Sequence, residues 1–139
     1  MFVSVGRPGA GLGHVGEPLL FRNTGAATCV LGGYPGVALV DKSGSGQVQA
    51  SRTPSGYLGG LASPSAIPPV IRVRPGQTVS ALFEGTDIPA GRARVCPGYR
   101  AMLVTPPNQT VTVRVAQPFA SLCRPQIHPV VAGTSGRQS

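Results

Sequence analysis

Residues 21–41, FRNTGAATCVLGGYPGVALVD, constrain the fold more than any other part of the chain. Apolar and polar residues alternate up to an Asn-Thr-Gly turn, and a short run with Cys29 follows. Gly-Gly-Tyr-Pro-Gly then separates that run from a second apolar run. Period-2 alternation bounded by glycine and proline is typical of strands joined by tight turns. The segment therefore predicts strand, turn, strand, turn, strand.

Glycine and proline punctuate the whole chain, with 20 and 15 of the 139 residues. They leave no stretch long enough for several turns of amphipathic helix, apart from runs that are already β-branched. We interpret them as turn residues of an all-β protein. A chain of this length with 41% hydrophobic residues can bury one core. We expect a single domain over residues 1–133 and a polar C-terminal tail over residues 134–139.

Seven to nine short strands at regular spacing are predicted, which is typical of an immunoglobulin-like Greek-key sandwich of two antiparallel sheets. The chain has no tryptophan, so it lacks the core hallmark of antibody domains. Residues 6–16 are expected to form a glycine-rich loop, and residues 53–69 are the most irregular region. Period-2 placement selects six core residues. They are Ile71, Val73, Val79, Phe83, Val111 and Val113.

The chain carries a formal net charge of +8, from 12 basic and 4 acidic residues. Arg72, Arg74 and Arg114 take outward positions of predicted strands, so they are candidates for a surface that meets an acidic envelope protein, an anionic cell-wall polymer or a lipid surface. The alternative is that the charge reflects solubility and genome composition. Specific nucleic-acid binding is not expected, because the few aromatic residues do not line one sheet face.

Three cysteines lack the spacing of a zinc site and favour one disulfide plus one free thiol in an oxidising compartment. We predict the bridge Cys96–Cys123, which flanks the hairpin at residues 101–115, and a free Cys29. A Cys29–Cys96 bridge is the rival pairing. The N-terminus lacks the regions of a signal peptide, and no apolar run reaches transmembrane length. Either the protein is cytosolic with free thiols, or it is an extracytoplasmic domain whose export segment lies outside this sequence. The strand-like segment that directly follows Met1 favours the second alternative, which we expect.

Several segments together resemble the domain of unknown function 4232, a family of secreted proteins and lipoproteins of actinobacteria, including mycobacteria. The most specific are GYPGV at residues 33–37, RPGQ at 74–77 and PPNQT at 106–110, within a resemblance that spans residues 2–133. Members often carry a further cysteine before the first strand, which this sequence lacks, so Cys29 has no evident partner. The resemblance implies an extracytoplasmic β-sandwich of the cell envelope and implies no reaction.

No arrangement of catalytic residues is evident. His14 and His128 are the only histidines, and no Gly-x-Ser-x-Gly nucleophile elbow accompanies them. The spacing from Cys123 to His128 suggests a copper site, but no methionine follows, and a disulfide at Cys123 would abolish it. The four acidic residues are expected to be surface charges or turn caps rather than paired catalytic carboxylates. They are Glu17, Asp41, Glu84 and Asp87.

The sequence thus predicts a non-catalytic envelope domain that mediates binding or assembly, without cofactor, metal or nucleotide. The alternative is a domain that binds a lipid or small molecule between the sheets or under the 53–69 region. An apolar cavity of ligand size would favour this alternative. A filled core with an exposed patch would favour contact with another protein.

Overall fold

The computed structural model describes residues 1–89, 91, 94–117 and 119–139. This part of the chain forms 13 strands and no helix, which confirms the all-β class and exceeds the seven to nine strands predicted. Within these residues there is accordingly no helix with the length and apolarity to cross a membrane. The strands are β1 (Phe2–Val5), β2 (Gly9–Gly11), β3 (His14–Arg22), β4 (Cys29–Gly32), β5 (Gly36–Asp41), β6 (Gln47–Gln49), β7 (Ser51–Arg52), β8 (Val70–Val73), β9 (Thr78–Thr86), β10 (Tyr99–Thr105), β11 (Val113–Val115), β12 (Cys123–Ile127) and β13 (Val131–Ala132).

The strands form three sheets instead of the two predicted. The largest, called the large sheet below, has seven strands in the order β1-β3-β9-β12-β7, with β2 also paired to β3 and β13 to β9. A four-stranded sheet has the order β11-β10-β5-β6, and β4 pairs with β8 in a two-stranded sheet. Among the described strands, all pairs are antiparallel except β12 with β7, so the prediction of purely antiparallel sheets was also wrong.

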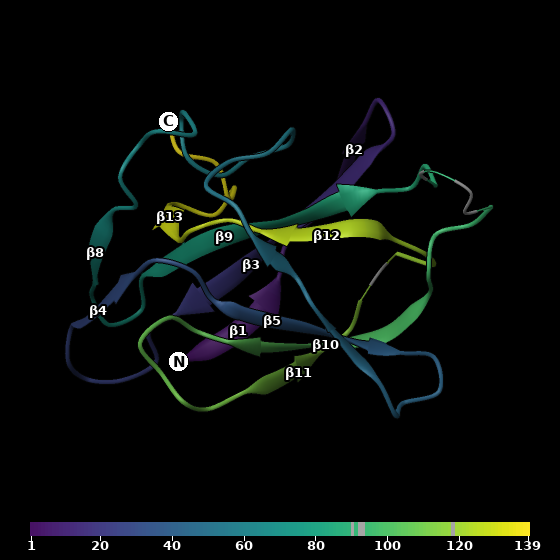
Figure 1. Ribbon diagram of the computed structural model, residues 1–139. Coiled ribbons are helices and arrows are strands. Elements are labelled where there is room, and N and C mark those ends of the chain that lie inside the picture. Colours follow the sequence, from purple (N-terminus) through teal and green to yellow (C-terminus); the bar gives the residue numbers. More distant parts are fainter. Residues whose placement is uncertain (90, 92–93, 118) are drawn as a thin grey trace.

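The hydrophobic core lies between the large sheet and the four-stranded sheet, which form two layers in Figure 1. Phe21 and Phe83 come from the large sheet, and Leu39 and Met102 come from the opposite layer. All four are fully buried. Burying a side chain of this size stabilises a fold by about 1.5–3 kcal/mol relative to its exposure. The face of the large sheet that meets this core is called the inner face.

The predicted core is largely confirmed. Val73, Val79 and Phe83 are fully buried, whereas Ile71 and Val113 are partly buried and pack against the core. Val111 is 69% exposed, so its assignment to the core was wrong. The reason is that the pairing with β10 covers only Val113–Val115, so residues 110–112 precede the strand instead of belonging to it.

The long strands β3 and β9 pair over nine consecutive positions and form the centre of the large sheet. Side chains alternate between the two faces of a strand. Leu19 and Phe83 therefore point to the inner face, while Leu20 and Leu82 point to the opposite face, called the outer face. The outer face carries a second layer made of irregular chain and not of a sheet.

Two segments make this second layer. One is the covering loop, residues 53–62, and the other is the C-terminal segment, residues 133–139, which lie together above the large sheet (Figure 1). The Gly60 N–H donates to the Gly136 carbonyl at 2.9 Å, and the Ser80 hydroxyl on β9 donates to the Gly133 carbonyl at 2.8 Å. Residues 134–139, expected as a polar tail, are thus hydrogen-bonded to the sheet and to the covering loop.

The glycine-rich stretch at residues 6–16, expected as a loop, contains β2 and the start of β3, which form a hairpin. Its two-residue turn consists of Leu12 and Gly13, both with positive φ, as in the turns that suit the twist of a hairpin. Gly9 and Gly16 face each other across this hairpin. The absence of side chains at both positions leaves space over the outer face.

Candidate functional site

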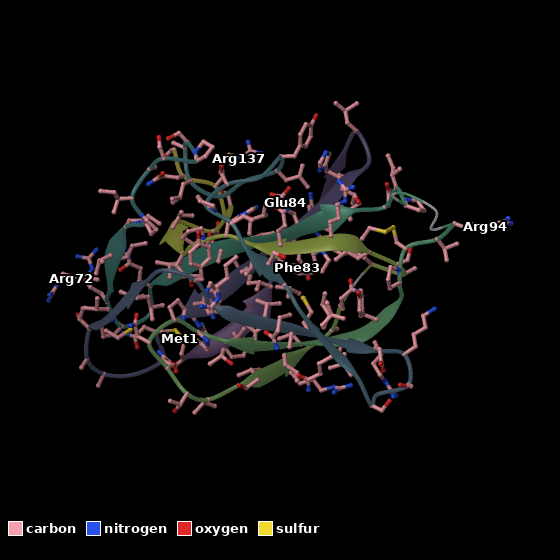
Figure 2. All side chains as sticks on the ribbon, in the orientation of Figure 1. Met1, Arg72, Phe83, Glu84, Arg94 and Arg137 are labelled. Atoms are coloured by element: carbon pink, nitrogen blue, oxygen red, sulfur yellow. A yellow bond between two sulfur atoms is a disulfide. The ribbon has the colours of Figure 1, made fainter. Side chains whose placement is uncertain are left out.

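The outer face holds a buried ion pair between Glu84 on β9 and His128, which follows β12. Glu84 is 2% exposed and His128 is fully buried, and His128 Nε2 lies 2.7 Å from Glu84 Oε2. β9 and β12 pair side by side, which brings these two residues together although 44 positions separate them in the chain. Glu84 and Phe83 lie on opposite sides of β9 (Figure 2).

The covering loop completes the surroundings of this pair. The N–H groups of Tyr57 and Leu58 donate to Glu84 Oε1 at 3.0 and 3.2 Å. The Nδ1 atom of His128 lies 2.9 Å from the Thr53 carbonyl oxygen. A carboxylate that accepts several hydrogen bonds and faces an imidazole is stabilised in its charged form. The pair therefore attaches the covering loop to the large sheet.

Two glycines allow the loop to approach so closely. A Cβ atom on Gly56 would lie 2.5 Å from Glu84 Oε2 and 2.6 Å from His128 Nε2. At Gly60, where φ is +93°, it would lie 2.9 Å from His128 Cγ. Both positions thus exclude larger residues, because the loop backbone packs directly on the ion pair.

The charge state of Glu84 follows from these contacts. Burial alone would raise its pKa, but the hydrogen bonds from His128 and from the Leu58 and Tyr57 amides, with the charge of His128, hold the pKa below its ordinary value. His128 Nε2 faces the Glu84 carboxylate, and Nδ1 lies within hydrogen-bond distance of both the carbonyl oxygen and the hydroxyl of Thr53, at 2.9 and 3.1 Å. Both ring nitrogens therefore have hydrogen-bond partners, and through Thr53 the imidazole connects the start of the covering loop to the large sheet.

A second buried glutamate, Glu17 on β3, points to the inner face. It is 1% exposed, and neither carboxylate oxygen has a hydrogen-bond partner among the residues that the structure describes. Burial raises its pKa from 4.5 to about 7. The expectation that Glu17 and Glu84 are surface charges or turn caps is wrong for both. Asp41 does cap a turn, since its Oδ1 accepts hydrogen bonds from Ser43 Oγ and the Gly44 N–H.

A cleft of about 460 Å³ opens on the outer face beside the ion pair. Leu20 and Leu82 form part of its floor, and Leu58 of the covering loop forms a wall. Arg7, from the segment between β1 and β2, and Arg137, from the C-terminal segment, also line it. Small-molecule sites typically have volumes of about 300–1,000 Å³, apolar linings and a few placed polar groups.

Leu58 connects the ion pair to the cleft. Its N–H donates to Glu84, its side chain lines the cleft, and its carbonyl oxygen accepts hydrogen bonds from Arg137 Nε at 3.3 Å and Nη2 at 3.0 Å. Because Leu58 has all three roles, the ion pair fixes the position of one wall of the cleft. Through the Leu58 carbonyl oxygen it also orients the guanidinium group of Arg137.

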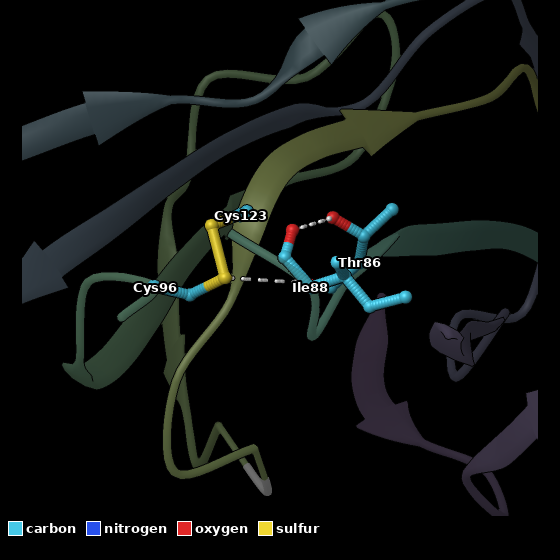
Figure 3. The surroundings of a disulfide bond; sticks show 4 residues. All are labelled: Thr86, Ile88, Cys96 and Cys123. Atoms are coloured by element: carbon cyan, nitrogen blue, oxygen red, sulfur yellow. Dashed lines mark hydrogen bonds between the residues drawn. A yellow bond between two sulfur atoms is a disulfide. The ribbon is translucent and has the colours of Figure 1, made fainter. Parts of the chain in front are cut away.

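The predicted disulfide Cys96–Cys123 is present, with a Cα–Cα distance of 4.9 Å, and Cys29 is a free thiol. The disulfide joins the segment before β10 to the start of β12. Its Cys96 sulfur lies beside the carbonyl oxygen of Thr86, at the end of β9 (Figure 3). Because Cys123 is in the bridge, it cannot be a thiolate ligand for copper. No cluster of three or more metal-ligating residues occurs at residues 1–89, 91, 94–117 and 119–139.

The arginines expected to meet an anionic partner do not share one sheet. Arg72 on β8 and Arg74 directly after it are exposed on the two-stranded sheet, whereas Arg114 is exposed on β11 of the four-stranded sheet. His14 stacks on Tyr57, with ring centroids 4.2 Å apart. It therefore supports the covering loop near the cleft and does not join His128 in one cluster.

Sequence reasoning missed the residues that build this site, although part of the signal was present. Glu17 continues the period-2 pattern of Leu19 and Phe21, so its burial could have been inferred. Glu84 ends an apolar strand pattern, and His128 is flanked by apolar residues. Their contact depends on the pairing of β9 with β12, which no local pattern contains.

The fold and the site together define an all-β, disulfide-linked domain with a cleft on one sheet face. The family model for the domain of unknown function DUF4232 matches residues 2–132, and the chain belongs to this family. No curated protein and no solved structure matches the chain.

Proposed function

We propose that this protein is a non-catalytic, extracytoplasmic domain of the cell envelope that binds a lipid or small molecule in the cleft on its outer face. The cleft carries the proposal: it has the volume of a ligand site, an apolar floor, and two arginines in its lining. The buried ion pair supports a binding role and not a catalytic one, because it is closed to solvent and holds the wall of the cleft.

The proposed setting has its own support. A disulfide persists in oxidising compartments and is rare in the cytosol of mesophiles, so Cys96–Cys123 favours an extracytoplasmic location. Secreted or lipoprotein status in an actinobacterium is part of the same proposal. The proposal also includes an immunoglobulin-like Greek-key sandwich as the fold, which the two layers around the core favour.

A cleft-filling variant tests the proposal. Gly9 pairs with Gly16 across the hairpin, so a side chain at position 9 would point into the cleft. A Cβ atom there meets nothing within 4 Å. Gly9→Leu should therefore fill the cleft without strain. Ala10→Leu is the matched control, because Ala10 is exposed, points to the other side of β2 and does not line the cleft.

The readout is the fluorescence of a neutral apolar probe, N-phenyl-1-naphthylamine, titrated with the folded domain. The proposal expects saturable binding by the wild type and by Ala10→Leu, and at least a tenfold loss of affinity in Gly9→Leu. Equal binding by all three proteins would contradict it, and so would no binding by the wild type.

A second candidate function rests on the two-stranded sheet. Arg72 and Arg74 are exposed there beside Val30 and Val70, which are also exposed. We propose that this basic and apolar patch meets an acidic envelope protein or an anionic surface. Binding to anionic liposomes or cell-wall polymer should weaken as salt rises, since the Debye length is about 8 Å at physiological ionic strength. Reversing both charges should slow association more than reversing Arg114, and equal effects would contradict a localised patch.

A further inference from the structure

We infer that the cleft binds an amphiphile with a single apolar chain and an anionic head, a carboxylate or a phosphate. This inference rests on the proposed function and specifies the chemistry of its ligand. Three features of the cleft carry it: the charge of its lining, the hydrogen-bonding capacity left on its arginines, and the position of its apolar residues.

Among the described residues, the lining has two positive charges and no negative one. Arg7 and Arg137 both line the cleft, and no aspartate or glutamate does. Glu84 lies on the same face of the sheet, but its carboxylate is already bound to His128 and to the Tyr57 and Leu58 amides. An anion in the cleft therefore meets arginines without a competing carboxylate.

Arg137 is held in place with hydrogen-bonding capacity to spare. A guanidinium group has five N–H donors, and the Leu58 carbonyl oxygen engages only the Nε and Nη2 groups. Within the described chain Arg7 makes no hydrogen bond to another side chain or to the backbone through its guanidinium group, and it is exposed. Guanidinium groups suit carboxylates and phosphates because their donors match the geometry of these anions.

The apolar part of the ligand would lie on the sheet. Leu20 and Leu82 come from adjacent strands, and Pro18 adds a third apolar residue to the same floor. Leu58 faces this floor from the covering loop. An elongated apolar chain can therefore contact the floor and this wall while its head remains with the arginines at the solvent side.

The experiment is isothermal titration calorimetry with four probes, each used below its critical micelle concentration. Decanoate and decyl phosphate carry a chain and an anionic head, decanol carries the chain alone, and inorganic phosphate carries the head alone. We expect both anionic amphiphiles to bind at least about tenfold more tightly than decanol. A factor of this size corresponds to the free energy of one charge-assisted hydrogen bond. Inorganic phosphate should bind far more weakly than decyl phosphate.

Variants locate the anion. Arg7→Gln should remove most of the preference for decanoate over decanol, and Arg72→Gln is its control because it makes the same charge change away from the cleft. Arg137→Lys keeps the charge but loses the forked donor geometry, and it should lower decanoate affinity less than Arg7→Gln lowers it. Circular dichroism of each variant establishes that it is folded.

The outcomes separate two failures. Equal affinity for decanol and decanoate would overturn the anionic head but leave a ligand cleft in place. Tight binding of inorganic phosphate alone would overturn the amphiphile, and so would equal losses in Arg7→Gln and Arg72→Gln, which would indicate a general charge effect. If none of the amphiphiles binds, the proposed function itself fails.

Discussion

Two buried glutamates on the central strands of the large sheet show that its two faces differ in the hydrogen bonds that they offer to a buried carboxylate. Glu17 lies opposite Phe83, and Gly16 lies opposite Glu84, so the two carboxylates are neighbours across one ladder but on opposite faces. Both are at most 2% exposed. Among the described residues Glu17 has no hydrogen-bond partner, and its pKa is raised, whereas Glu84 has three partners, His128 and two backbone amides, and its pKa is lowered.

The difference arises from what covers each face. The inner face packs against another sheet, whose backbone N–H groups are used in its own ladder and cannot turn toward a carboxylate. The outer face is covered by an irregular loop, whose free N–H groups at Tyr57 and Leu58 point at Glu84. A loop layer can therefore satisfy a buried charge that a sheet layer leaves unpaired.

The largest effect is expected from breaking the ion pair. His128→Leu leaves the Glu84 carboxylate buried with only backbone donors, and it should lower the free energy of unfolding by roughly 3–5 kcal/mol. Urea unfolding at pH 7 measures this, and the double variant Glu84→Leu/His128→Leu should recover part of the loss. A cost below about 1 kcal/mol for the single variant would mean that the pair does not hold the loop.

Replacing Glu17 should raise the free energy of unfolding at neutral and higher pH, whereas breaking the ion pair lowers it. Its pKa rises on folding from 4.5 to about 7. The contribution of Glu17 to stability is therefore most favourable below pH 4.5, and it is lost as pH rises toward and through 7. Glu17→Gln has no proton to lose. It should match the wild type near pH 4 and exceed it by roughly 3–3.5 kcal/mol at pH 8, because a pKa raised from 4.5 to about 7 corresponds to about 1.4 kcal/mol per pKa unit. A wild type and variant that differ equally at both pH values would contradict the buried, unpaired carboxyl.

The acidic limb of the same profile belongs to Glu84. Because folding lowers its pKa, its contribution is present above the ordinary value of 4.5 and is lost as pH falls below that value and through the lowered folded pKa. The wild-type free energy of unfolding should therefore reach its maximum near pH 4.5 and fall on both sides. Glu84→Gln should make the acidic limb shallower but not flat, because hydrogen bonds also lower the pKa of Asp41, and it should leave the limb between pH 4.5 and 7 unchanged. A wild-type profile that is flat across both limbs would contradict the assignment.

The smallest effect is expected from the loop glycines. Gly56→Ala places a Cβ atom against Glu84 and His128, and it should cost about 1–3 kcal/mol, as is usual for overpacking. Gly9→Ala is the control, because its Cβ atom meets open space, and it should change stability by less than about 0.5 kcal/mol. Thermal unfolding compares the two, and equal effects would place the loop farther from the ion pair than the structure has it.

The sequence predicts what depends on local pattern. Period-2 alternation placed Val73, Val79 and Phe83 in the core, and the small number of cysteines limited the disulfide to a few pairings. The same pattern placed Val111 incorrectly, because alternation alone does not indicate where pairing with a neighbouring strand begins. The third sheet and the parallel pair of β12 with β7 depend on long-range pairing and left no local signal.

The candidate site was less predictable than the fold for the same reason. Its parts come from the segment between β1 and β2, from β2, β3 and β9, and from the covering loop and the C-terminal segment. Glycine is used there for close approach and not only for turns. The sequence does indicate the irregular region at residues 53–69 as a candidate cover for a ligand. Its contact with Glu84 could not be inferred, because the contact depends on backbone amides, which every residue except proline has.

The most direct test of the account is a titration of the ¹⁵N-labelled domain with decanoate, followed by two-dimensional NMR. The account predicts that amide signals of Gly9, Gly16 and Leu58 shift together and saturate, with those of Leu82 and Ser135, because all five residues line the cleft. Signals of Val30 and Arg72 on the two-stranded sheet should stay in place. Shifts confined to the two-stranded sheet or to the inner face, or no saturable shift, would contradict a ligand cleft on the outer face.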